Sequence, residues 1–204
     1  MNKSVKSKLL KRVRGTGRGY VFSAKDFLDL GSRPSVDKAL SELVKEQAVR
    51  RVGRGLYYYP RKSKLLEQEL SPDLDQVARA LARKSGQRIE PAGAWAANLL
   101  GLSSQVPARA VYLTDGRTRT VSFRNHKIQF THVEPKQLVG RRRSTNLVIQ
   151  ALRHLGRDRI NETTIQSLRQ RFDPKTRRAL ANDAKYSTDW VYDVIKRVAV
   201  EEVA

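Results

Sequence analysis

Arginines next to glycines are the most informative chemical groups in this sequence. Arg54 lies between Gly53 and Gly55, and Arg50 and Arg51 come shortly before it. A guanidinium binds phosphate oxygens and base edges through several N–H donors. Glycines on both sides permit a tight turn that presents the arginine at its tip. An arginine presented in this way can enter the minor groove of DNA, so the spacing predicts a DNA contact.

One set of residues resembles a catalytic arrangement. Asp115 and then Glu134 and Lys136 mimic the Asp … Glu-x-Lys pattern of metal-dependent nucleases, in which carboxylates hold Mg²⁺. The spacing is loose, and Pro135 removes a backbone donor from the strand that should present the pair. We therefore interpret these residues as charges at turns and strand ends and predict no enzyme, with a metal-dependent nuclease as the remote alternative.

Other catalytic, metal and cofactor signatures are missing. The chain has no cysteine, which excludes disulfides, Cys-ligated zinc and thiol catalysis. The three histidines, His126, His132 and His154, do not have the spacing of metal ligands. There is no phosphate-binding GxxxxGK[ST] loop, no GxGxxG and no GxSxG motif. The sequence thus predicts no cofactor and no metal.

The charge balance favours a polyanionic partner. The 204 residues include 41 Lys/Arg and 20 Asp/Glu, for a formal net charge of +21, and residues 1–64 alone hold 17 basic and 5 acidic side chains. Such a field attracts nucleic acid, although a basic surface kept for solubility is the simpler alternative. Apolar stretches fall far short of the roughly 20 residues of a membrane span. We expect a cytoplasmic protein that does not associate with membranes.

The elements that position these arginines form a winged helix-turn-helix over residues 1–62. We expect a helix over 4–14, a short strand over 20–22, and a short helix capped by Ser23 and ended by Gly31 in the left-handed conformation. A second long helix turns one apolar face inward, and a hairpin follows over 49–59. The predicted DNA-binding residues are Lys25, Arg33, Ser35, Lys38, Ser41, Lys45, Arg50, Arg51 and Arg54.

The rest of the sequence predicts a polar linker over 63–73 and a second domain over 74–204. This domain contains both helices and strands, so we predict the α+β fold class. Helices are expected over 74–84, 91–100, 145–155, 161–171, 175–185 and 188–199. Three short strands over 110–113, 118–123 and 127–133, joined at turn dipeptides, predict a small antiparallel meander. Trp95 and Trp190 lie within apolar helical stripes and are expected in the core.

The N-terminal pattern resembles a known family. The segment Gly19-Tyr20-Val21-Phe22, the helix over 36–45 and above all the run RRVGRGLYYYP over 50–60 are similar to the winged-helix domain of AbiEi-type antitoxins, from the type IV AbiE toxin–antitoxin systems of abortive infection, a phage defence. The resemblance implies a DNA-binding antitoxin that represses its own operon. It also implies a nucleotidyltransferase-like toxin as functional partner, whose neutralisation need not involve a stable complex.

Two questions stay open at this level. The triplet Arg141, Arg142 and Arg143 is either part of an antitoxin surface or a solvated run of charge. The chain as a whole is either the antitoxin that the resemblance implies or a stand-alone winged-helix transcription regulator whose second domain senses a ligand or dimerises.

Overall fold

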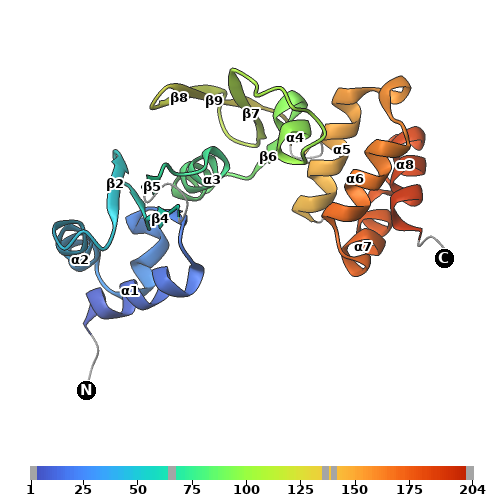
Figure 1. The fold of residues 1–204 in the computed structure, drawn as a ribbon. Helices are drawn as coiled ribbons and strands as arrows, with labels where there is room; N and C mark the ends of the chain where they lie inside the picture. Colours follow the sequence, from blue (N-terminus) through green and yellow to red (C-terminus); the bar gives the residue numbers. More distant parts are fainter. Residues whose placement is uncertain (1–3, 64–67, 135–137, 139–141, 201–204) are drawn as a thin grey trace. The chain divides into compact units, whose positions relative to one another are not determined.

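A computed structural model describes residues 4–63, 68–134, 138 and 142–200. The chain divides into two compact units, Met1–Gln87 and Arg88–Ala204. Both contain helices and strands, which confirms the α+β class (Figure 1). None of the helices in the described ranges is long and apolar enough to cross a membrane.

The helices and the hairpin expected in the N-terminal unit are present in the expected order. They are α1 (Val5–Thr16), β1 (Val21–Phe22), the 3₁₀ helix η1 (Ala24–Leu30), α2 (Arg33–Lys45), β2 (Arg50–Gly53) and β3 (Leu56–Tyr58). The strands form an antiparallel sheet in the order β1-β3-β2. Gly53 pairs with Leu56, so that Arg54 and Gly55 alone form the hairpin turn, and Gly55 takes the positive φ of 67° that this turn requires.

The apolar faces of the helices meet in one core. Val36, Leu40 and Leu43 of α2 are fully buried, as their spacing predicts, and pack with apolar residues of α1 and η1. Ser32 caps α2, since its side-chain oxygen accepts a hydrogen bond from the Ser35 backbone N–H. The orientation expected for α2 is therefore confirmed.

Gly31 ends η1 for a different reason from the one expected. Its φ of 165° is extended backbone and not the left-handed conformation. A Cβ atom on Gly31 would lie 2.9 Å from Cγ2 of Val5 in α1. The glycine therefore permits a close approach of η1 to α1, which the sequence pattern does not reveal.

The predicted domain boundary over 63–73 is wrong, because α3 (Leu74–Ser85) belongs to the N-terminal unit. Arg83 of α3 donates hydrogen bonds to the Val21 carbonyl oxygen (2.7 Å) and to Oδ1 of Asp26 (3.0 Å). Its guanidinium also lies over the Tyr20 ring, 5.4 Å from the centroid. In place of a plain linker, β4 (Arg61–Lys62) and β5 (Glu69–Leu70) form an antiparallel pair before α3.

The C-terminal unit joins a four-stranded sheet to a group of helices (Figure 1). Its elements are β6 (Ile89–Pro91), α4 (Gly93–Leu99), β7 (Arg109–Thr114), β8 (Arg119–Phe123), β9 (His126–His132), α5 (Arg143–Leu155), the 3₁₀ helix η3 (Arg157–Arg159), α6 (Glu162–Arg171), α7 (Pro174–Ala184) and α8 (Asp189–Ala199). Trp95 is buried and donates a hydrogen bond from Nε1 to the Tyr112 hydroxyl at 2.8 Å. Trp190 is only partly buried, against the helical core.

The strand order differs from the expected meander. The order is β6-β7-β9-β8, and β7 pairs with β9 in parallel. The two inner strands, β7 and β9, contribute the fully buried Tyr112, Ile128 and Phe130, whereas β8 takes the edge. The loop after β7 crosses the end of β9, where the Thr118 hydroxyl accepts a hydrogen bond from the His132 N–H at 2.9 Å.

Candidate nucleic-acid interface

The solvent face of α2 is polar and basic. Because Val36, Leu40 and Leu43 occupy the inner face, the helical period turns Ser35, Lys38, Ser41 and Lys45 outward, and all four are exposed. The ammonium groups of Lys38 and Lys45 have no polar partner within the described part of the chain. These charges are available to phosphate oxygens, and the two serines are short enough for a close approach to base edges.

The first turn of α2 makes local bonds. Nε of Arg33 lies 2.7 Å from Oδ2 of Asp37, one helical turn later, and the Ser35 hydroxyl lies 2.9 Å from that of Ser32. Both partners of the Arg33–Asp37 pair are about half exposed, and such surface pairs contribute roughly 0–1 kcal/mol to stability. A phosphate can therefore replace Asp37 as the partner of Arg33 at small cost.

The β2–β3 hairpin presents two of its three predicted arginines. Arg51 and Arg54 are exposed, and no acceptor for their guanidinium groups occurs in the ranges described. The turn itself is held by α3, because Nζ of Lys84 donates a hydrogen bond to the Arg54 carbonyl oxygen at 2.9 Å. The backbone of the tip is thus fixed while the Arg54 side chain points to solvent.

Arg50 does not share this exposed position. Its guanidinium donates to the Gln47 carbonyl oxygen at 2.6 Å and lies 3.1 Å from a carboxylate oxygen of Glu69 in β5. The pattern of consecutive arginines in the sequence could not distinguish Arg50 from Arg51, because Glu69 reaches it from nineteen positions away.

Lys25 lies on the exposed side of η1. The start of this helix is rigid, since the Asp26 carboxylate accepts the Ser23 backbone N–H at 2.7 Å and also binds Arg83. Lys25 therefore belongs to a helix start that is held by the Ser23–Asp26 and Arg83–Asp26 contacts.

Acidic residues neutralise part of the remaining basic surface of this unit. Lys6 pairs with Glu42 and Glu46. Arg12 donates two hydrogen bonds to the Asp29 carboxylate, and these bonds lower the pKa of Asp29. Lys6 and Arg12 of α1 thus differ from the exposed lysines of α2 and the exposed arginines of the hairpin, whose charges no described carboxylate offsets in this way.

The arginine triplet is divided in the structure. Arg141 lies outside the described residues, and Arg143 is the exposed first residue of α5. Arg142 lies 2.9 Å from a carboxylate oxygen of Asp183, whose side chain is only 8% exposed. Arg142 therefore offsets the charge of a nearly buried carboxylate, and the triplet does not form one open run of charge.

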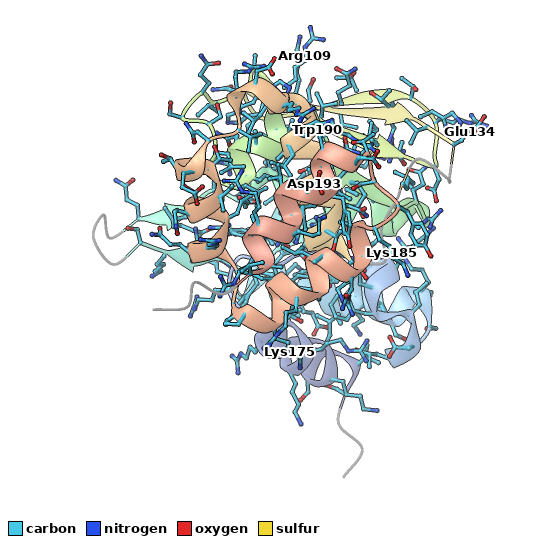
Figure 2. The ribbon with its side chains drawn as sticks, turned by 90° about the vertical axis from the view of Figure 1, so that its right-hand side faces the viewer. Arg109, Glu134, Lys175, Lys185, Trp190 and Asp193 are labelled. Carbon is cyan, nitrogen blue, oxygen red and sulfur yellow. The ribbon has the colours of Figure 1, made fainter. Side chains whose placement is uncertain are left out.

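Of the nuclease-like residues, the structure describes Asp115 and Glu134. Both oxygens of Asp115 accept hydrogen bonds from Arg88, one from its backbone and one from its side chain. Burial disfavours the ionised carboxylate, but these bonds and the charge of Arg88 outweigh it and lower the pKa of Asp115. Glu134 is exposed beyond β9 (Figure 2), and Lys136 lies outside the described residues. Within the described ranges no three His, Asp or Glu side chains are grouped to hold a metal ion.

The histidines have other surroundings. His126 and His154 are exposed, and Nδ1 of His132 lies 2.9 Å from the Gly116 carbonyl oxygen in the loop that crosses β9. Lys175 and Lys185 lie at opposite ends of α7, and Trp190 and Asp193 lie on α8 (Figure 2).

Residues 8–180 match the model of a family of unknown function, DUF6088. No curated protein matches the chain.

Proposed function

The chain belongs to the DUF6088 family, whose function is unknown, and we propose that it binds duplex DNA through α2 and the β2–β3 hairpin. One observation carries this proposal. Four exposed cations on these two elements, Lys38, Lys45, Arg51 and Arg54, have no polar partner in the described ranges. Elsewhere in the same unit, acidic residues neutralise several of the cations.

The element order supports a particular docking. A helix, a strand, two further helices and a hairpin follow one another as in winged helix-turn-helix domains. In the proposed complex, α2 enters the major groove with Lys38 and Ser41 towards the bases. Arg54 extends from the hairpin tip to the minor groove or its phosphates.

The test is a binding titration with duplex DNA from the region upstream of the gene. Lys38→Ala and Arg54→Ala should each weaken binding by about 1–3 kcal/mol, the range of a good DNA contact. Arg178→Ala, at an exposed arginine of α7, removes the same charge from the other unit and should change the affinity little. Equal losses in all three variants would leave only a general electrostatic effect and refute the assignment of α2 and the hairpin.

We further propose a biological role that rests on the resemblance to AbiEi-type antitoxins. The protein represses its own toxin–antitoxin operon in the cytoplasm and counteracts a nucleotidyltransferase-like toxin. The separate helical core of the C-terminal unit supports a second activity there, independent of DNA binding.

Co-expression with the product of a neighbouring nucleotidyltransferase-like gene tests this role. Residues 88–204 alone should rescue growth but not repress the operon. If full-length protein fails to rescue growth, the antitoxin role is wrong. A stand-alone transcription regulator then becomes the better interpretation.

A further inference from the structure

A basic cavity lies within the N-terminal unit. It has a volume of about 340 Å³ and lies between the end of α1, the turn after α2 and the segment that follows β3. Its charged lining consists of Arg14, Arg18, Arg50, Lys62 and Glu69.

Positive charge predominates in the cavity. Among the described residues that line it, Glu69 is the single acidic one, and Glu69 is already paired with Arg50 at 3.1 Å. Arg14 and Lys62 are exposed, with no polar partner for their charged groups anywhere in the described chain. Arg14, Arg18 and Lys62 thus surround one small space without a described carboxylate to offset their charge.

Arg18 is held in place at the wall. Its guanidinium donates a hydrogen bond to the Pro60 carbonyl oxygen at 2.9 Å and lies over the Tyr59 ring, 5.2 Å from the centroid. These two contacts use part of the guanidinium and leave further N–H groups to donate. A guanidinium fixed in this way loses little side-chain entropy when an anion binds.

The chemistry of such a lining selects an anion with several oxygen atoms. Like charges around one cavity repel one another, and a bound anion removes this repulsion. Arginine forks match the oxygens of phosphate, and lysine adds a point charge. The volume is at the small end of the range for ligand sites, roughly 300–1,000 Å³, and suits a phosphate or diphosphate group.

We propose that this cavity binds a phosphate group, at a site distinct from the exposed face of α2 and the hairpin tip. The phosphate comes either from the backbone of bound nucleic acid or from a free phosphorylated small molecule. This proposal does not depend on the proposed function. Apart from Arg50, the cations that line the cavity are not among the residues predicted to bind DNA.

The first experiment uses pyrophosphate as the probe and isothermal titration calorimetry of the full chain at constant ionic strength. The double variant Arg14→Ala/Lys62→Ala should lose at least tenfold in affinity for pyrophosphate. The matched control Lys175→Ala/Arg178→Ala removes the same charge from exposed positions of α7 and should keep the wild-type affinity. Circular dichroism checks that both double variants are folded. If Arg14→Ala/Lys62→Ala is not folded, Arg14→Gln takes its place.

A second experiment identifies the source of the phosphate. Both double variants are titrated with duplex DNA. A loss of DNA affinity confined to Arg14→Ala/Lys62→Ala assigns the site to a backbone phosphate, whereas unchanged DNA affinity together with lost pyrophosphate binding assigns it to a small molecule. The proposal is overturned if wild type binds no pyrophosphate and the two double variants bind DNA equally. It is also overturned if the control loses as much pyrophosphate affinity as the cavity variant.

Discussion

Replacing Arg83 with alanine should destabilise the N-terminal unit alone. Arg83 joins α3 to β1 and η1 through hydrogen bonds to the Val21 carbonyl oxygen and the Asp26 carboxylate. The Asp26 side chain is only 13% exposed, so that removal of Arg83 leaves a poorly solvated carboxylate without its cation.

The expected magnitude follows from these contacts. A hydrogen bond to a charged group contributes about 1.5–3 kcal/mol, and the contact with the Tyr20 ring adds about 0.5–1 kcal/mol. Solvent reaches the Arg83 side chain, which is 38% exposed, and this weakens both contributions. We therefore expect a loss of about 2 kcal/mol, which for a unit of this size lowers the melting temperature by about 10 °C.

Two spectroscopic signals separate the units. Both tryptophans, Trp95 and Trp190, belong to the C-terminal unit, whereas far-ultraviolet circular dichroism detects the helices of both. Arg83→Ala should shift the dichroism transition of the N-terminal unit and leave the tryptophan fluorescence transition in place. Lys8→Ala, at an exposed residue of α1, should shift neither. A change below about 0.5 kcal/mol for Arg83→Ala would refute the assignment of α3 to this unit.

Three further predictions concern packing and titration. Leu40→Ala should cost about 2–5 kcal/mol in urea unfolding, because Leu40 is fully buried, and an unchanged midpoint would mean that α2 is rotated. Trp95→Phe should lower the free energy of unfolding, followed by circular dichroism, by about 1–3 kcal/mol, because the Tyr112 hydroxyl loses its donor. An equal loss in Tyr112→Phe would support this hydrogen bond, and no loss in either variant would refute it. Because its pKa is lowered in the folded state, Asp115 stabilises the fold above its ordinary pKa of 3.8, and this contribution disappears as the pH falls through the lower folded value. Asp115→Asn should therefore be less stable than wild type at pH 7 but not at pH 2, and an equal difference at both would contradict the Arg88 contact.

Local pattern was enough to predict α2 and the hairpin. The spacing of Val36, Leu40 and Leu43 determined the buried face, and the glycines around Arg54 indicated the turn. Both are decided by residues within a few positions of one another, where helical period and turn geometry dominate.

Long-range contacts account for what could not be predicted. Arg83 meets Asp26 across 57 positions, and no composition shift marks α3 as part of the first unit. Because β8 lies on the far side of β9, β7 and β9 pair in parallel, and turn dipeptides do not report such a crossover. The basic cavity brings Arg14 and Arg18, at the end of α1, together with Lys62 after β3, so no local spacing rule could have found it.

The most direct test of the DNA-binding claim is the salt dependence of duplex binding by residues 1–87. This fragment contains α1 to α3 and the complete core of the unit. We predict that it binds the upstream duplex, and that log K falls linearly with log salt concentration, since phosphate contacts release counterions. The slope should decrease by about one unit in Arg54→Ala. A folded 1–87 fragment that binds no duplex at low salt would contradict the central claim.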